Sequence, residues 1–418
     1  MTDLLQRIQE LQFADKGAAE ALLLDFVREI YAPDVQSIEL RPLAVSLNSF
    51  NGFLTRADGI RLFFKTHTES DTVIGEYYQA ALLAEAGYPV IRPVFSSTET
   101  GKQLLIYEVI ESPSVFDVAW AIETGSSDQF EVLCAAQQAG DDYLLALYRA
   151  TLSDQSPQPA AQSPVHQLFY HRLHGGRLER FYGPLAGQSG DFPSVALPGG
   201  SRSIAEVRRA HWEINGQVYS ETLDAVIERA LRLLQPEQAG PAIIGHGDAH
   251  NGNVFLQQSG DGASLLYFDP AFAGRHHPLL DLTKPLFHNV FAMWMYFPQE
   301  KQQQTPISLQ VDGHTWRVTY DYALHPVRSM FWESKVERVL LPILIELKQR
   351  GWLRPDWRAY LKAALFCCPF LTMNLADSGR FPAEISLLGL AMAVEMGAES
   401  HGERSLLDRT LDQVESEL

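Results

Sequence analysis

The sequence predicts an α+β protein of two lobes, with a small antiparallel sheet in the first lobe and a larger, mostly helical second lobe. Three observations predict this class. Short β-rich runs separated by turns occupy residues 38–110 around one helical stretch. Apolar residues recur at helical spacing from residue 327 onward. The chain has 418 residues, which is long for one core and suits two.

The first lobe is expected to span residues 1–110. Its two N-terminal helices each carry an apolar face and should pack on the sheet. An Asp58-Gly59 turn precedes a strand that ends in Lys65. In chain order, the elements expected here are helices at 3–11 and 17–31, strands at 43–45, 53–56 and 60–65, a helix at 76–85, and a strand at 104–110.

The second lobe is expected to span residues 111–418, with an insertion at 153–220. Two hairpins, with Asn-Gly and Asp-Gly turns, should sit on this lobe or pair with each other. The polar, Pro-rich stretch 153–164 predicts a linker or mobile loop. The remaining elements expected are helices at 116–121, 130–152, 221–234, 327–350, 355–374 and 383–398, and the hairpins at 212–219 and 307–320.

A basic and aromatic run at 169–182 stands out within the insertion. One interpretation is a segment that closes over an active site and meets anionic groups, because Arg offers bidentate geometry. The other is a surface helix whose Arg stems cover apolar side chains. The sequence favours the second.

Composition limits the classes of partner. The net charge of −18 and the pI of about 5.1 argue against nucleic acid, whose phosphates are bound by Lys and Arg. The same charge is compatible with a cationic substrate, although it mainly reflects solubility. No run of about eighteen apolar residues occurs, so we expect no membrane partner.

The cysteines and the N-terminus predict a cytoplasmic protein. Cys134, Cys367 and Cys368 are too few for a disulfide framework, which favours a reducing compartment. The first residues lack a basic region followed by a long apolar run, so no signal peptide is expected.

The most informative motif is His246-Gly247-Asp248-Ala249-His250-Asn251-Gly252-Asn253, followed by Asp269 at the end of an apolar strand. Phosphoryl transfer needs a carboxylate that orients and deprotonates the attacking hydroxyl, and Asp248 suits that role. It also needs oxygen ligands for Mg²⁺, and Asn253 and Asp269 supply them. Loop acids that merely cap nearby backbone would be the alternative, but the spacing of all three favours catalysis.

These residues resemble the aminoglycoside phosphotransferase and choline kinase-like family, within the protein kinase-like superfamily. The resemblance rests on His246 to Asn253, on Asp269, and on the later Gly274, Pro278 and Asp281-Leu282. It implies a bilobal protein kinase-like fold with Asp248 as catalytic base and Asn253 and Asp269 as metal ligands. His246, His250 and Asp281 would support the loop. This chain departs from the family at 274–278, where Gly-Arg-His-His-Pro replaces Gly-Asp-Pro.

The resemblance also implies a nucleotide site in the first lobe. Lys65, held by Glu76, would bind the α- and β-phosphates. Small polar residues at 46–52, among them Ser46 and Asn48, occupy the place of a phosphate loop without being Gly-rich. Glu108 and Ile110 would meet adenine through their backbone groups, although an ordinary core strand predicts the same side chains.

The resulting hypothesis is an enzyme that transfers the γ-phosphoryl group of ATP (or GTP) to a hydroxyl of a small molecule, of aminoglycoside, sugar or amino alcohol type. Mg²⁺ is the expected cofactor. A catalytically silent nucleotide-binding pseudokinase and an interaction module remain alternatives. The acceptor, the preferred nucleotide, the oligomeric state and the roles of the insertion and the two hairpins stay open.

Overall fold

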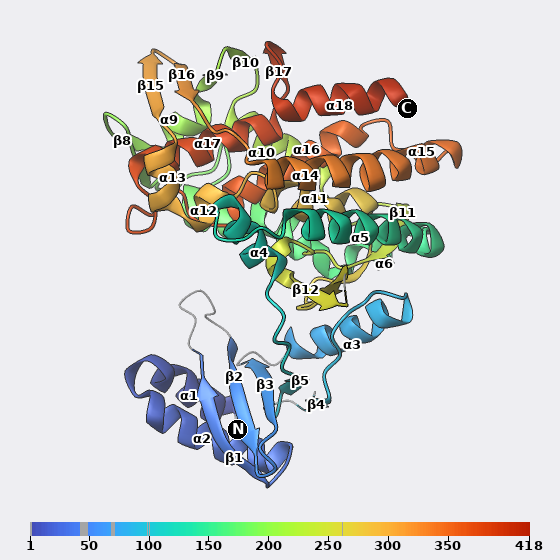
Figure 1. Cartoon of the computed structure of the whole chain (residues 1–418). Coiled ribbons are helices and arrows are strands. Elements are labelled where there is room, and N and C mark those ends of the chain that lie inside the picture. The colour runs from blue at the N-terminus through green and yellow to red at the C-terminus, as the bar shows by residue number, and fades with distance from the viewer. Residues whose placement is uncertain (1, 42–48, 68–71, 98, 100, 261) are drawn as a thin grey trace. The chain divides into compact units, whose positions relative to one another are not determined.

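The computed structural model describes residues 2–41, 49–67, 72–97, 99, 101–260 and 262–418 (Figure 1). The chain forms two compact units. The first comprises Met1–Pro113 together with Leu266–Ala271, and the second comprises Ser114–Leu265 and Phe272–Leu418. The short segment 266–271 therefore belongs to the first unit although it follows the catalytic motif in the sequence.

The first unit is built on a five-stranded antiparallel sheet in the order β1-β2-β3-β5-β4. Its strands are β1 (Val35–Leu40), β2 (Ser49–Arg56), β3 (Arg61–His67), β4 (Phe95–Ser97) and β5 (Leu104–Glu108). The turn between β2 and β3 contains Gly59 at φ 82°, a left-handed conformation that glycine adopts readily. The predicted antiparallel sheet is thus confirmed. The strand expected at 43–45 lies outside the described residues.

Helices α1 (Thr2–Ala14) and α2 (Lys16–Ile30) provide the apolar cover of this sheet. Asp15 caps α2, because its carboxylate accepts a hydrogen bond from the backbone N–H of Ala18 at 3.1 Å. Leu23 on α2 is fully buried in one cluster with Phe64 of β3. Burial of this amphipathic face stabilises the unit. The third helix, α3 (Thr72–Glu85), contacts β3.

The second unit is mostly helical (Figure 1). Helix α16 (Trp357–Leu371) is mostly apolar and every residue from Tyr360 to Leu371 is buried, as expected of a central helix. The longer helices are α4 (Val115–Glu123), α5 (Phe130–Thr151), α10 (Leu223–Leu233), α11 (Pro278–His288), α14 (Pro326–Lys335), α15 (Leu341–Gln349), α16 (Trp357–Leu371), α17 (Ala383–Gly397) and α18 (Leu406–Glu417). Among the described residues, no helix has both the length and the apolar character required to cross a membrane.

The two predicted hairpins pair with each other. Their strands form a five-stranded sheet in the order β15-β16-β9-β10-β17, with β16 parallel to β9. The bounds are β9 (His211–Ile214), β10 (Gln217–Tyr219), β15 (Ile307–Asp312), β16 (Thr315–Tyr320) and β17 (Ser400–Gly402). Asn215 and Gly216 have φ values of 50° and 83°, as the predicted Asn-Gly turn requires.

One predicted element was wrong. Residues 153–164 are not a linker, because β6 (Ser153–Gln155) pairs antiparallel with β11 (Gly240–Gly245) and α6 (Pro157–Ala161) follows. Proline at the start of α6 is compatible with a first helical turn. The helix expected at 327–350 is present as α14 and α15, which a π-helical turn, η3 (Val336–Leu340), joins just before Pro342. Proline lacks an N–H and cannot continue the regular hydrogen-bond ladder.

The insertion consists of short elements. A hairpin of two strands follows a series of single helical turns. These elements are η1 (Pro164–Leu168), α7 (Tyr170–Leu173), α8 (Arg177–Tyr182), β7 (Ser194–Leu197), β8 (Gly200–Ser203) and α9 (Ile204–Arg209). Helix α7 contacts α10 and α16, so the basic run is part of the packed unit rather than a separate surface helix.

Candidate active site

Strand β11 of the second unit ends directly before the motif His246–Asn253. Five of its six residues are buried, and the loop begins directly after Gly245. Gly247 adopts φ 79°, and a Cβ atom there would lie 2.4 Å from the carbonyl oxygen of Phe272. A side chain at this position would therefore collide with backbone, which explains the glycine before Asp248.

Asp281, at the start of α11, joins the loop to the helical core. Its Oδ1 accepts hydrogen bonds from the Gly247 N–H at 2.5 Å and from His276 Nε2 at 3.1 Å, while Tyr148 donates its hydroxyl to Oδ2. Burial acts to raise the pKa of Asp281, but the bonds from His276, Tyr148 and Gly247 outweigh it and hold the pKa below its ordinary value. The buried carboxylate is thus ionised.

Other contacts fix the remainder of the loop. His250 Nδ1 accepts from the Gly252 N–H at 3.1 Å and caps the single helical turn η2 (Asn251–Asn253). The Asn251 N–H donates to Asn289 Oδ1 at 2.8 Å. The Asn253 amide donates to the carbonyl oxygen of Asp248 at 2.9 Å. These hydrogen bonds fix the conformation of the loop, which lacks the backbone hydrogen bonds of a longer helix or a strand.

Asp248 has one carboxylate oxygen whose hydrogen-bonding capacity is unused within the described part of the chain. Its Oδ1 is buried and has no hydrogen-bond partner among the described residues. The nearest cation is Lys284 on α11, whose Nζ lies 3.7 Å from that oxygen. The Asp248 side chain is 15% exposed. A buried acceptor without a donor is uncommon in a folded protein, and an incoming hydroxyl would satisfy it.

The first unit contributes a separate pair of charged residues. Lys65 Nζ lies 2.9 Å from Asp269 Oδ1, with exposed fractions of 16% and 42% for the two side chains. Asp269 adopts φ 54°, one of two described non-glycine residues with a positive φ. Such conformations are often found at functional sites. The predicted partner of Lys65, Glu76, lies on α3 with its side chain outside the described residues, so that pairing stays a prediction.

Of the other residues predicted for the nucleotide site, two lie outside the described residues and two lie within them. Ser46 and Asn48 lie outside the described residues. Glu108 ends β5 and pairs in register with Leu62 of β3, and Ile110 follows in the segment that leads to the second unit. Their predicted contact with adenine stays a prediction, as does the sharing of one ion by Asn253 and Asp269, which belong to different units.

A comparison with protein-family models matches residues 40–305 to the phosphotransferase enzyme family. The chain belongs to this family. The match covers strands β2 to β5 of the first unit, the insertion and the whole motif from His246 to Asp269. It confirms the suspected family resemblance and the prediction of an enzyme of the phosphotransferase class. The predicted α+β class, with a small antiparallel-sheet unit and a larger, mostly helical unit, is also confirmed.

Solved structures give remote likenesses to this phosphotransferase. A macrolide 2'-phosphotransferase type I has 14% identity and a TM-score of 0.40, with 90% of this chain and 97% of that chain covered. An ethanolamine kinase of Plasmodium vivax has 10% identity and a TM-score of 0.41, with coverage of 99% and 93%. A thermostable aminoglycoside phosphotransferase in a ternary complex with ADP and hygromycin B has 12% identity and a TM-score of 0.46, with coverage of 90% and 98%. A comparison with curated proteins finds no match.

The donor atoms of Asn253 and Asp269, the two predicted metal ligands, are of the kind that Mg²⁺ binds. Asn253 uses its amide nitrogen on the loop, which leaves its amide oxygen as the atom to face a cation. Asp269 offers a half-exposed carboxylate. A carboxylate and an amide oxygen are the hard ligands that Mg²⁺ prefers, with water completing its coordination.

Sequence reasoning missed the cations around Asp248. Lys284 is buried on α11, one turn after Asp281, and its side chain is 4% exposed. The i, i+3 spacing of Asp281 and Lys284 was a usable signal, because both side chains then share one face of a helix. Arg172, in the basic run of the insertion, has a buried Nη1 with no hydrogen-bond partner among the described residues. The surface-helix interpretation of that run is therefore wrong at Arg172.

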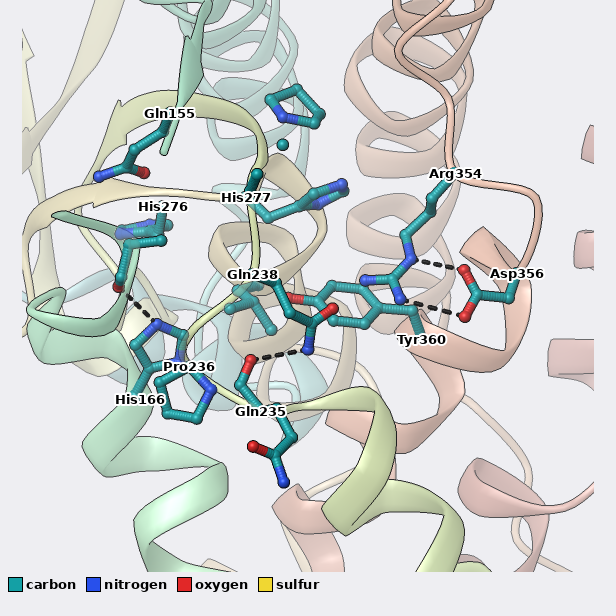
Figure 2. Close-up of a pocket in the computed structure, with 15 residues that line it drawn as sticks. Gln155, His166, Gln235, Pro236, Gln238, His276, His277, Arg354, Asp356 and Tyr360 are labelled. Atoms are coloured by element: carbon teal, nitrogen blue, oxygen red, sulfur yellow. Dashed lines mark hydrogen bonds and ion pairs between the residues drawn. The ribbon is translucent and has the colours of Figure 1, made fainter. Parts of the chain in front are cut away.

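A cavity of about 200 Å³ lies elsewhere in the second unit. Figure 2 shows His166 and His276 on one side and the Arg354–Asp356 ion pair beside Tyr360 on the other. The His277 ring packs against that of Tyr360, with centroids 5.1 Å apart. Burial, with smaller effects of Arg354 and His276, lowers the pKa of His277 to about 3. His276 lines the cavity and also bonds Asp281, so this cavity adjoins the supports of the catalytic loop.

Proposed function

We propose that this phosphotransferase moves the γ-phosphoryl group of ATP (or GTP) to a hydroxyl of a small molecule, with Asp248 as catalytic base. The observation that carries the proposal is the Asp248 carboxylate. It has a buried oxygen without a hydrogen-bond donor, on a loop held by the ionised Asp281. That arrangement suits a group that must accept a proton from an incoming hydroxyl.

The proposal assigns a residue to each requirement of the transfer. Asp248 orients the acceptor hydroxyl and removes its proton as the oxygen attacks. Lys65 would bind the α- and β-phosphates, with Glu76 as its predicted support. Asn253 and Asp269 would hold Mg²⁺, which when bound offsets negative charge on the phosphate oxygens. Lys284 places an ammonium group 3.7 Å from the Asp248 carboxylate.

The test separates catalysis from nucleotide binding. Asp248→Ala should lower kcat by a factor of roughly 10² to 10⁴, the usual contribution of general base catalysis. Its Mg²⁺-dependent rise in Tm with ATP should match that of the wild type, because Asp248 is not assigned to the metal or the nucleotide. Asp269→Ala should instead reduce the Mg²⁺-dependent rise itself. Both variants are followed by thermal shift and by acceptor-dependent ADP release.

Three outcomes would contradict the proposal. Full turnover of Asp248→Ala would exclude Asp248 as the base. A wild-type protein that binds Mg²⁺-nucleotide but releases no ADP with any acceptor would favour the silent pseudokinase. A wild-type protein whose Tm does not respond to ATP or GTP would favour the interaction module.

A further inference from the structure

Three cationic side chains gather around the proposed base. Arg172 on α7, Arg177 at the start of α8 and Lys284 on α11 come from different elements of the second unit. Lys284 Nζ lies 3.7 Å from Asp248 Oδ1. The charge of Asp248 acts on the pKa of each of these three cations. These three residues are called the cationic cluster below.

The cations are close enough to repel one another. Burial is the main cause that lowers the pKa of Lys284, and Arg172 and Arg177 add to it, whereas Asp248 opposes it. Burial likewise lowers the pKa of Arg177 to about 10, with Arg172 as the second cause. With Asp248 the cluster carries a net positive charge, inside a protein whose overall net charge is −18. Buried charges normally have partners.

Not every hydrogen-bond donor of the cationic cluster has an acceptor among the described residues. Arg177 donates Nη1 to the carbonyl oxygens of Leu371 at 3.1 Å and Thr372 at 2.6 Å, at the end of α16. Arg172 Nη1 is buried and has no hydrogen-bond partner among the described residues. The hydroxyl of Thr372 is in the same state. An unpaired buried guanidinium N–H costs free energy, which a ligand oxygen would recover.

We propose that the acceptor of this phosphotransferase carries an anionic group, a carboxylate or a phosphate ester, which Arg172 and Lys284 bind beside the hydroxyl that Asp248 deprotonates. The proposal rests on the proposed function, because it places the acceptor at Asp248. A guanidinium and an ammonium are the side chains that recognise such anions. A polycationic aminoglycoside would meet repulsion at the same place.

A panel of matched acceptors tests the charge. The carboxylate arm compares glycerate and gluconate with glycerol and glucose, and the phosphate arm compares glucose 6-phosphate with glucose. Ethanolamine and kanamycin represent cationic acceptors. ADP release at fixed Mg²⁺-ATP should be faster for the anion of a pair, with kcat/KM at least roughly 10-fold higher, as expected when charged groups would otherwise stay unpaired. The arm that responds identifies the anion.

Variants then locate the effect. Arg172→Gln should raise KM for the anionic acceptor by roughly 10- to 100-fold, with KM for ATP unchanged and Mg²⁺-ATP thermal shift intact. Arg338→Gln removes an equal charge from an exposed ion pair with Asp142 and should change neither constant. Thermal shift of the wild type with the same acceptors and a non-hydrolysable ATP analogue gives a second readout that needs no turnover.

Several outcomes overturn the inference. The first is a kcat/KM for the neutral or cationic acceptors that equals or exceeds that for the anionic ones. The second is a rise in KM for ATP, instead of for the acceptor, in Arg172→Gln. The third is a protein that binds Mg²⁺-ATP but shows no anion-dependent ADP release or Tm shift. In the last of these outcomes, nucleotide binding is established and only the inference about the acceptor fails. Absence of Mg²⁺-ATP binding would instead overturn the proposed function, and the inference with it.

Discussion

The catalytic loop owes its shape to buried polar side chains that lie far from it in the sequence. Asp281 is 2% exposed and receives hydrogen bonds from a loop N–H, an imidazole and a phenol. Each donor would be unsatisfied without the carboxylate, and the loop would lose its link to α11. Asp281 is therefore a positioning residue that acts through Gly247 on the neighbouring Asp248.

Asp281→Asn should impair both stability and turnover. An amide replaces one acceptor oxygen by a donor that faces other donors, so we expect a loss of about 2–4 kcal/mol in the free energy of unfolding. We also expect kcat to fall by at least tenfold as the loop shifts. Urea unfolding and ADP release measure the two effects. Tyr148→Phe removes one bond and should cost only about 1 kcal/mol. Native stability and turnover in Asp281→Asn would refute this role.

A second residue-scale effect concerns pH. Burial raises the pKa of Glu395 on α17 to about 7, although the hydroxyl of Tyr320, 2.6 Å from its Oε2, acts to lower it. The folded state then holds a proton that the unfolded state releases above pH 4.5. Stability should fall as the pH rises from about 4.5 to 7, by about 2 kcal/mol after allowance for partial exposure.

Glu395→Gln should remove that dependence. Glutamine still accepts the bond from Tyr320 but does not titrate. The measurement is the urea midpoint at pH 4.5, 5.5, 6.5 and 7.5, for the wild type and the variant. Parallel curves for the two proteins would show that Glu395 is not the titrating group.

At the scale of elements, helix α18 shows how a polar helix is attached to the core. The sequence analysis did not predict it, because most of its residues are polar and its apolar face is narrow. Asp408 on α18 is buried and pairs with the buried Lys362 of α16. The same carboxylate accepts from the Ser400 N–H at 2.8 Å, which connects β17 to the pair.

Asp408→Ala should destabilise the second unit by about 3–5 kcal/mol, because the buried Lys362 ammonium loses its hydrogen-bonded carboxylate and keeps only the more distant Glu399, at 3.8 Å. The control is Asp412→Ala, one turn further along α18. Asp412 pairs with Arg358 but is 45% exposed, and such pairs contribute about 1 kcal/mol or less. Urea unfolding compares the two variants, and equal losses would argue against a special role of the buried pair.

At the scale of the whole molecule, the chain has two compact units with separate cores. Leu23 is fully buried in the cluster formed by α1, α2 and the first sheet. Leu388 is fully buried on α17 in the second unit. A protein with two such cores need not unfold in one step.

Leucine-to-alanine variants test this separation. Leu23→Ala should lower the Tm of one calorimetric transition, and Leu388→Ala should lower that of the other, each through a loss of about 2–5 kcal/mol. Differential scanning calorimetry without nucleotide is the measurement. One transition that both variants shift equally would mean that the units unfold together.

Local signals made part of the site predictable. His246 to Asn253 are contiguous, and their loop follows a buried strand that the apolar run 242–244 already indicates. The hairpin turns were equally accessible, since Asn215-Gly216 requires a left-handed backbone that few other pairs adopt. By contrast, residues 153–155 look like a linker, and only their pairing with β11 makes them a strand.

The sequence by itself determined the family, the α+β class and the proposed base, because those depend on residue types at short fixed spacings. Only the tertiary structure decided what surrounds Asp248. Arg172 and Lys284 are more than a hundred positions apart in the chain, and neither belongs to the motif. The packing of α7 and α11 against α16 brings both within electrostatic reach of Asp248. Electrostatic interactions depend on distance and burial, which a linear pattern does not specify.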